Sequence, residues 1–150
     1  NILVAGGNGP GDDSTGLHKP SFIFVDKDYS VYVLDDLNIR VMKWVKGAKE
    51  GILVAGGYGE GELSIQFYYP STIIVDDFGN LYVSDRNNYR IMRRINGASD
   101  NTIIVGGNGY GNKSNQLSHP TDFVFDRYGN IYVLNSYDFS RIQKFYIASN

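Results

Sequence analysis

Two histidines are the side chains of this sequence best suited to acid–base or metal chemistry, and their surroundings support neither role. His18 and His119 belong to no H-x-x-H or H-E-x-x-H pattern, and no serine lies in a G-x-S-x-G pattern. The sequence contains no cysteine, so disulfides, zinc–thiolate sites and thiol nucleophiles are excluded. We predict no catalytic residue, no metal ligand and no cofactor, and we place both histidines in surface loops.

A glycine-rich string near the start of the sequence is superficially similar to a phosphate-binding loop. Residues 6–11 read G-G-N-G-P-G. A P-loop needs Lys-Ser or Lys-Thr and a following helix, and a dinucleotide-binding loop needs a helix as well. Neither feature follows here. We interpret the string as a turn that leads from an outer strand to the next inner strand.

Pairs of one aspartate and one arginine, five residues apart, are the strongest candidates for charged contacts. Asp35 precedes Arg40, and Asp85 precedes Arg90. A carboxylate and a guanidinium so placed predict a paired fork across a turn, with a nearby asparagine bonding the turn backbone. Because the motif recurs along the chain, we interpret it as structural rather than as a ligand contact. The same reasoning makes turn formers of three further aspartates: Asp26, Asp76 and Asp126.

The charge balance argues against nucleic acid as the main partner. The chain has 14 lysines and arginines against 16 aspartates and glutamates, a net charge of −2, whereas phosphate-backbone binding needs a concentrated basic surface. One basic cluster keeps an RNA-binding platform as an alternative: Arg86, Arg90, Arg93 and Arg94. No apolar run approaches the roughly 18 residues that would span a bilayer, so we predict no membrane partner.

The sequence repeats itself three times with a step of 50 residues, which explains why these motifs recur. The residues that recur 50 and 100 positions later are Gly6, Gly7, Gly9, Gly11, Ser14, Pro20, Asp26, Tyr32 and Val33. The arginine keeps this step at positions 40 and 90, but its third copy, Arg141, comes one residue late. Such a period is typical of propellers, solenoids and arrays. We predict one segment with repeats at about 1–50, 51–100 and 101–150.

Each repeat carries four short apolar runs that are separated by turn residues. Aromatic residues make up 14% of the chain and glycine appears 18 times, a composition that favours strands and turns. The nearly continuous runs at 21–25, 71–75 and 121–125 predict innermost strands that are buried on both faces. The predicted outermost strands are 2–5, 52–55 and 102–105. The pattern predicts an all-β fold, a β-propeller of four-stranded antiparallel blades, with three blades in this chain.

The residues of these blades resemble the NHL repeat. The resemblance rests on P-S-F-I-F-V-D with V-Y-V-L-D-D-L-N-I-R in the first copy and on L-Y-V-S-D-R-N-N-Y-R-I in the second. The G-G-N-G-x-G linkers are similar to those of extracellular NHL-repeat proteins. This resemblance implies a propeller, commonly six-bladed, that acts as a binding platform. The third copy departs from the pattern, because Asn135 replaces the aspartate of positions 35 and 85.

The resemblance also implies alternatives to a binding platform. A minority of NHL-type propellers are lyases or hydrolases with a site in the central channel, and some bind RNA on a basic face. The lyases use several histidines around a central metal, a set that His18 and His119 do not supply. We therefore predict a non-enzymatic scaffold or binding module that is located outside the cell. Asn112-Lys113-Ser114 matches the N-glycosylation rule and fits that location.

The expected propeller topology brings the glycine-rich loops and the loops after the second strands to one end of the molecule. Aromatic side chains with polar tips suit contacts with a peptide or glycan ligand. The predicted partner face consists of Tyr58, Tyr68, Tyr69, Tyr110, Tyr137, His18 and His119.

The order of the strands predicts that the chain pairs with itself. It begins with an outermost strand, Ile2-Leu3-Val4-Ala5, and reaches a third strand at 141–146 that has no outer neighbour. Unpaired edges favour pairing with another chain. We expect strand 2–5 to pair head to tail with the strand carrying Ile142, Lys144 and Tyr146, in a second copy or a continuing chain. Two copies would form a six-bladed dimer, and a joint that fails to close would build a filament.

Overall fold

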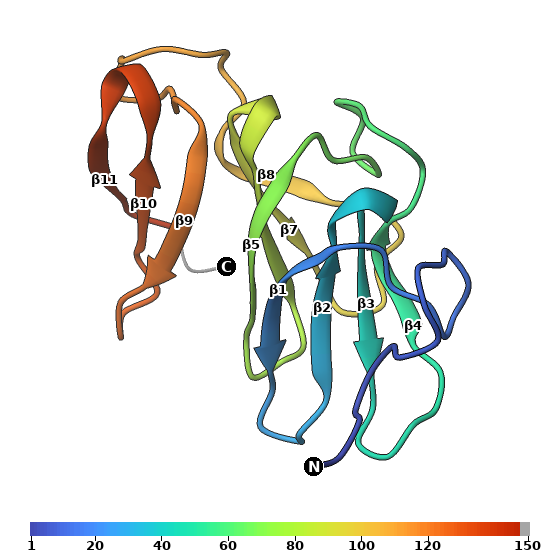
Figure 1. The fold of residues 1–150 in the computed structure, drawn as a ribbon. Coiled ribbons are helices and arrows are strands. Elements are labelled where there is room, and N and C mark those ends of the chain that lie inside the picture. Colours follow the sequence, from blue (N-terminus) through green and yellow to red (C-terminus); the bar gives the residue numbers. More distant parts are fainter. Residues whose placement is uncertain (148–150) are drawn as a thin grey trace.

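The chain folds into three antiparallel β-sheets that follow one another along the sequence (Figure 1). The computed structural model describes residues 1–147. Blade 1 contains β1 (Pro20–Val25), β2 (Val31–Asp35), β3 (Arg40–Trp44) and β4 (Ile52–Gly56). Blade 2 contains β5 (Pro70–Val75), β6 (Leu81–Asp85), β7 (Arg90–Arg94) and β8 (Thr102–Gly106). Blade 3 contains β9 (Pro120–Phe125), β10 (Ile131–Asn135) and β11 (Arg141–Phe145).

A turn of four or five residues follows the second strand of every blade. In each blade this turn contains a short 3-10 helix: η1 (Asp36–Asn38), η2 (Arg86–Asn88) and η3 (Tyr137–Phe139). These turns lie at the same end of the molecule as the loops 57–69 and 107–119, which connect one blade to the next (Figure 1). The hairpin turns between first and second strands lie at the opposite end.

The hairpin turns form where the sequence places an aspartate after the first strand. The Asp26 side chain accepts hydrogen bonds from the backbone N–H groups of Asp28 and Ser30, at 3.0 and 2.8 Å. Asp76 and Asp126 make the same two bonds in their own blades. An aspartate that binds backbone N–H groups two and four residues on closes the turn locally. The interpretation of these residues as turn formers is confirmed.

The outer strands end at the double glycines, where no other residue would fit. Gly56 has a left-handed backbone with φ of 74°, and a Cβ there would lie only 2.3 Å from the Ile39 carbonyl oxygen. Gly106 repeats this arrangement against Tyr89. Glycine alone adopts this conformation without strain and permits the close approach. The chain therefore turns at these points into the loop that leads to the next inner strand.

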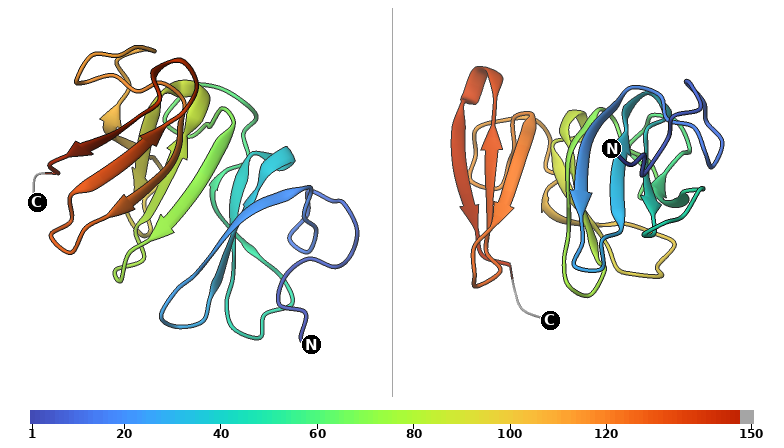
Figure 2. Two further views of the ribbon diagram at one scale, coloured as in Figure 1. Left: turned by 60° about the vertical axis from the view of Figure 1, so that its left-hand side comes forward. Right: turned by 60° about the horizontal axis from the view of Figure 1, so that its bottom comes forward.

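The blades fan out side by side, with their first strands adjacent (Figure 2). β1 packs beside β5, and β5 beside β9. The blade 1–blade 2 junction buries residues from both sheets: Leu34, Val41, Ala55, Phe67, Ile73, Val75, Leu81, Val83 and Met92. The blade 2–blade 3 junction buries a corresponding group: Ile91, Val105, Leu117, Phe123, Ile131 and Val133. Apolar area removed from water at these junctions is the main force that holds neighbouring blades together.

Burial of the first strands depends on the position of the blade. β5 is largely buried on both faces, as predicted. The same prediction is wrong for β1, in which no residue is fully buried. β9 has only two buried residues, Pro120 and Phe123. Blade 2 has a neighbour on each side, whereas blades 1 and 3 each have one, so similar apolar runs differ in exposure.

Residues 2–5 form no strand in this single chain, so that element of the prediction is wrong here. A strand requires a neighbour for its backbone N–H and C=O groups. The expected neighbour, β11, belongs to the blade farthest along the chain. Ala5 and Leu17 nevertheless pack against a buried group on blade 1: Val33, Met42 and Trp44.

Within the part of the chain that the structure describes, no helix is both long and apolar enough to cross a membrane. The last three residues of the predicted third repeat, 148–150, lie outside the described residues.

Candidate functional site

An arginine on the third strand of blade 2 anchors the loop that enters that blade. Arg90 donates through Nε to Asp85 at 2.7 Å, and its two terminal nitrogens donate to the carbonyls of Glu62, Leu63 and Gln66. Arg90 has an exposed fraction of only 5%. We call this set of hydrogen bonds the arginine anchor. Blade 1 repeats it, with Arg40 donating to Asp35 at 2.8 Å.

The ion pair in each anchor differs from the paired fork that the sequence predicts. Only Nε of Arg90 meets the carboxylate, because Asp85 Oδ1 already accepts the Tyr68 backbone N–H at 2.7 Å. Asn88 donates to Asp85 Oδ2 and also to the Gly61 carbonyl in the loop. The carboxylate thus ties two loops to the sheet, and the guanidinium's remaining N–H groups are used by backbone carbonyls. Its role is structural.

Asp85 is fully buried, and this burial raises the pKa of its carboxyl group. Hydrogen bonds from Tyr68, Asn88 and Arg90 act in the opposite direction by stabilising the charged form. A buried carboxylate needs this many donors, because an unpaired buried charge would cost several kcal/mol.

Blade 3 departs from the anchor at the position where Asn135 replaces aspartate. Asn135 Oδ1 still accepts a backbone N–H, that of Ser118, at 2.8 Å. Its Nδ2 now donates to Gln143 at 2.9 Å. Arg141 still binds loop carbonyls, including that of Gln116 at 3.0 Å, but its buried Nε has no hydrogen-bond partner among the described residues.

The carboxylate that blade 3 lacks inside the anchor appears three residues later, on the surface. The asparagine of blade 2, Asn88, corresponds in the repeat to Asp138. Asp138 is exposed and accepts a hydrogen bond from the Tyr110 hydroxyl at 2.6 Å. This hydrogen bond raises the pKa of Tyr110. In blade 3 the carboxylate of this turn therefore lies at the surface, beside Tyr110, and not inside the anchor.

Five rings make up an aromatic cluster: Tyr89, Tyr110, His119, Tyr137 and Phe139. The His119 ring lies 5.2 Å from Tyr89, 5.5 Å from Tyr110 and 5.0 Å from Tyr137, measured between centroids, and each pair is tilted edge to face. Such geometry is favourable for aromatic pairs. Tyr110 and Tyr137 are also exposed to solvent.

A second, smaller aromatic group lies on blade 2. The rings of Tyr68 and Tyr69 are 5.4 Å apart, and the Arg86 guanidinium lies 5.9 Å from the Tyr69 ring centre, within range of a cation–π contact. Tyr69 and His119 occupy the same repeat position and share a left-handed backbone, with φ of 51° and 56°. Lys19 has this conformation as well, so it belongs to the blade architecture and only the side chain distinguishes the blades.

The structure brings together some of the predicted partner-face residues and leaves others apart. Tyr110, Tyr137 and His119 belong to one cluster, and Tyr68 contacts Tyr69. No ring contact joins Tyr58 or His18 to either group among the described residues. Sequence reasoning missed two members of the cluster, Tyr89 and Phe139. Both lie 50 or 100 residues after Ile39 of blade 1, in the turn after the second strand, so the repeat alignment contained the signal.

Buried polar atoms without partners lie in the segments that form these two groups. They are His119 Nδ1, Arg86 Nε and Asn87 Oδ1. Most buried polar groups in proteins are hydrogen-bonded, so each such atom has unused capacity to bind a polar group. Within residues 1–147, no group of three or more histidine, aspartate or glutamate side chains is placed to hold a metal ion.

The three radially arranged sheets, each packed on the next through its apolar face, define an incomplete β-propeller. Structural comparison agrees. A structural genomics protein of unknown function from Bacteroides thetaiotaomicron superposes with a TM-score of 0.69 at 18% identity, over 83% of this chain and 34% of that protein. Virginiamycin B lyase from Staphylococcus aureus superposes with a TM-score of 0.54 at 16% identity, over 93% of this chain and 44% of the lyase.

A streptogramin B lyase structure gives a similar result, with a TM-score of 0.54 and 16% identity over 93% of this chain and 43% of that protein. The chain thus spans between about a third and less than half of the length of these structures. At such low identity the likeness establishes the propeller fold alone. Comparison of the sequence with protein-family models and with curated proteins finds no match.

Proposed function

We propose that this chain is half of a non-enzymatic, NHL-type propeller that acts as an extracellular binding module, and that the aromatic cluster of blade 3 contacts its partner. One observation carries the proposal. Blade 3 lacks the aspartate of the arginine anchor and has Asn135 in its place. In the following turn its carboxylate, Asp138, accepts a hydrogen bond from the hydroxyl of Tyr110, a member of the aromatic cluster. Features that serve the fold recur in every blade, whereas a binding site on a propeller is asymmetric.

The chemistry of the cluster favours a protein segment as its partner. Tyrosine rings offer a large apolar face and a polar tip at low conformational cost, and such residues dominate protein–protein contacts. Tyr110 and Tyr137 present exposed ring surface, and the His119 ring packs edge to face against both of them. The Tyr69–Arg86 pair extends this surface with one positive charge. An extended peptide with aromatic and acidic side chains matches this combination.

The experiment is a screen of the folded chain against a displayed peptide library, followed by calorimetry on the best peptide. We expect Tyr110→Ala and Tyr69→Ala to weaken binding about tenfold or more, which is the usual effect of truncating a central interface tyrosine. Tyr128→Ala is the matched control, because Tyr128 is also an exposed tyrosine but belongs to a hairpin turn at the opposite end of blade 3. Equal losses in all three variants would contradict the proposed surface. Selective binding of a glycan array instead would identify a different class of partner.

The extracellular location is supported by the sequon at Asn112. The Asn112 side chain is exposed, and its loop is held to the sheet through the Asn112 carbonyl, which accepts a hydrogen bond from Arg141. A glycan would therefore extend into solvent without disturbing the blade. Expression in a secreting eukaryotic host should add a glycan mass that Asn112→Gln removes. An unmodified secreted chain would contradict glycosylation at this site.

A further inference from the structure

We propose that a second copy of this chain completes the propeller, with residues 2–5 of each copy adding as the missing fourth strand of blade 3 in the other copy. The inference rests on the proposed role of the chain as half of a propeller. It does not depend on what the aromatic cluster binds.

The free edge of β11 is the first observation. β3 and β7, the corresponding strands of blades 1 and 2, each carry an outer neighbour, whereas β11 has none within residues 1–147. In blade 1 the neighbours pair as Arg40↔Gly56, Val41↔Ala55 and Met42↔Leu53. Blade 2 repeats this register, including its bulge. An edge whose counterparts are both paired is a template for strand addition.

The same register transferred to blade 3 assigns a partner to each position of the incoming strand. Arg141 would pair with Gly6, Ile142 with Ala5, Gln143 with Leu3 and Lys144 with Ile2 of the second copy. Gly6 is left-handed, with φ of 66°, as Gly56 and Gly106 are where they end their strands. The incoming strand therefore ends in the conformation that the two existing outer strands adopt.

Residues 2–5 already lie where an outer strand belongs relative to the following blade. Ala55 packs on the face of blade 2 and Val105 on the face of blade 3. Ala5, their repeat equivalent, packs on the corresponding face of blade 1. The segment is held on one side by its own blade and lacks only the backbone partner that β11 of a second copy would provide.

The open faces of the first and last blades carry the two halves of a standard blade junction. Ile73 of blade 2 is fully buried, and its repeat equivalent in blade 1, Ile23, is 63% exposed. Ile91 of blade 2 is fully buried, and its equivalent in blade 3, Ile142, is 71% exposed. Apolar residues at these positions are buried whenever a neighbouring blade is present. The faces are complementary because each internal junction joins this same pair.

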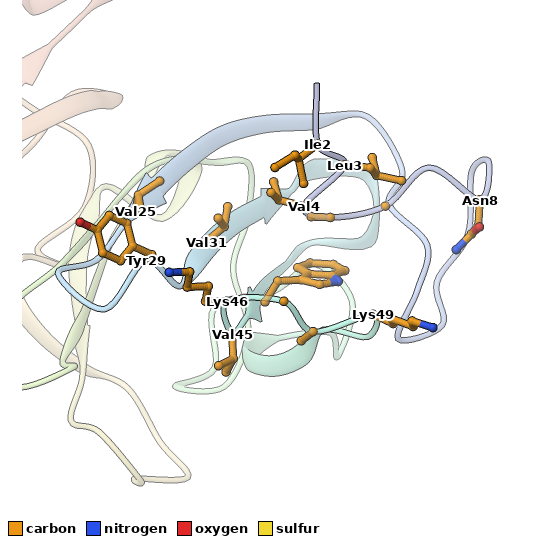
Figure 3. A pocket seen from close by; sticks show the side chains of 15 residues that line it. Ile2, Leu3, Val4, Asn8, Val25, Tyr29, Val31, Val45, Lys46 and Lys49 are labelled. Carbon is orange, nitrogen blue, oxygen red and sulfur yellow. The ribbon is translucent and has the colours of Figure 1, made fainter.

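An apolar cavity on blade 1 lies where the second copy's blade 3 would pack. It has a volume of about 730 Å³ and lies between residues 2–5 and the Val25, Val31 and Trp44 side chains (Figure 3). At the junction of blades 1 and 2, side chains of the second and third strands of the preceding blade, such as Leu34 and Val41, contribute to the buried core. Leu134 and Ile142 of the second copy have those positions in the repeat.

A second hollow, of about 330 Å³, lies between β8, the Ser114–Asn115 segment and Phe145. The incoming strand would enter there. In blade 2, Asn101 precedes the outer strand and donates Nδ2 to the Ser64 carbonyl at 2.6 Å. Asn1 precedes residues 2–5 in the same way, and Ser114 corresponds to Ser64. Asn1 of the second copy would therefore bind the Ser114 carbonyl.

Two copies of the chain are the number that forms a closed ring of blades. Propellers contain roughly four to eight blades, so two copies with six blades lie inside this range and three copies with nine lie outside it. A ring of two copies has a two-fold axis and contains the same joint twice. Closed symmetry of this kind leaves no sheet edge unpaired at either joint.

The first test is the solution mass of the chain, measured by light scattering during size-exclusion chromatography. We expect a particle of about twice 16.7 kDa. Ile142→Asp and Ile23→Asp should each raise the dimer dissociation constant about 100-fold or more, because each places an unpaired carboxylate in the buried junction. Phe78→Asp is the matched control, since Phe78 is exposed at a hairpin turn of blade 2 and should leave the dimer intact. A folded monomer, or a control variant that dissociates equally, would overturn the proposal.

The second test reads the register directly, using the absence of cysteine from the chain. The double variant Leu3→Cys, Gln143→Cys places thiols at a predicted cross-strand pair, where Cβ atoms lie close enough for a disulfide. Mild oxidation should give a covalent dimer on a non-reducing gel. Leu3→Cys, Lys144→Cys is the control, because those side chains would point to opposite faces of the sheet. A ladder of larger oligomers would overturn the closed ring, and equal cross-linking in both variants would overturn the register. Peptide binding through Tyr110, measured on the same samples, would be unaffected by either failure.

Discussion

Blades 2 and 3 solve the same structural problem with different chemistry. Both must hold a glycine-rich loop against the sheet, and both use an arginine on the third strand. In blade 2, Arg90 is completed by the buried carboxylate of Asp85. In blade 3, the acceptors of Arg141 among residues 1–147 are neutral carbonyls, because Asn135 has turned its amide toward Gln143.

The difference shows that the aspartate of the repeat has two separable tasks. Its Oδ1 accepts a backbone N–H from the loop, and an asparagine does this equally well, as Asn135 does for Ser118. Its Oδ2 neutralises the arginine, and an amide cannot. Gln143 stands where blade 2 has Met92 and gives the Asn135 amide an acceptor. The substitutions at the two positions in blade 3 are therefore coupled.

The largest expected effect comes from removing the two arginines separately. Arg90→Ala should lower the free energy of unfolding by about 4 kcal/mol, because it leaves the buried Asp85 carboxylate without its cation. Arg141→Ala should cost about 1–2 kcal/mol, because it removes bonds between a cation and neutral carbonyls only. Urea unfolding followed by circular dichroism measures both. Equal losses would mean that the carboxylate contributes nothing to the anchor.

Converting the blade 2 anchor into that of blade 3 should have the next largest effect. Asp85→Asn should cost about 2 kcal/mol, because the new amide N–H groups would face the Arg90 and Asn88 donors. Met92→Gln alone should also be destabilising, because Met92 is buried in the blade 1–blade 2 junction. Combined with Asp85→Asn, it should cost about 1 kcal/mol less than the sum of the two single variants, because it supplies the acceptor that Gln143 provides in blade 3. A double-mutant cycle on unfolding free energies checks this coupling. Strictly additive effects would show that Asn135 and Gln143 are independent.

The reverse conversion should stabilise blade 3. Asn135→Asp places a carboxylate near Arg141 Nε, which has no partner among the described residues. Gln143 can rotate its amide and donate to the new carboxylate. We expect a gain of about 1 kcal/mol in the free energy of unfolding. A loss of stability would show that the altered turn of blade 3 holds the guanidinium out of reach.

The smallest effect concerns the hairpin turn of blade 3, which matches that of blade 2 and should behave independently of the anchor. Hydrogen bonds from Asn130, together with the Tyr128 backbone N–H, lower the pKa of Asp126. A lowered pKa in the folded state stabilises the fold above the unfolded value of about 4, and this contribution is lost as the pH falls through the folded pKa. The stability difference between the wild type and Asp126→Asn should therefore shrink between pH 5 and pH 3. A difference that stays constant over this range would show that the charge of Asp126 is irrelevant.

Much of the fold could be predicted from the sequence because the determinants are local and occur three times. The hairpins at Asp26, Asp76 and Asp126 form through bonds between neighbouring residues. The outer strands stop at glycines because only glycine fits there. The aromatic cluster was predicted in part, since Tyr110, His119 and Tyr137 stand in loops at one end of the blades. Tyr89 was missed because its ring reaches His119 across the junction of two blades.

The amino-acid sequence by itself determined the number of blades in this chain, the order of their strands and the positions of their turns, because each depends on contacts within one 50-residue repeat. Only the tertiary structure decided how the third anchor is completed and which rings meet. It also decided that β1 stays largely exposed to solvent and that residues 2–5 form no strand. Those outcomes depend on residues distant in the sequence, such as Asn135 with Ser118 and Arg141 with Gln116, and on whether a neighbouring blade is present to bury an apolar face. Each repeat contains the apolar residues for both faces of a blade, but only the three-dimensional arrangement of the blades shows which faces are in contact with a neighbour.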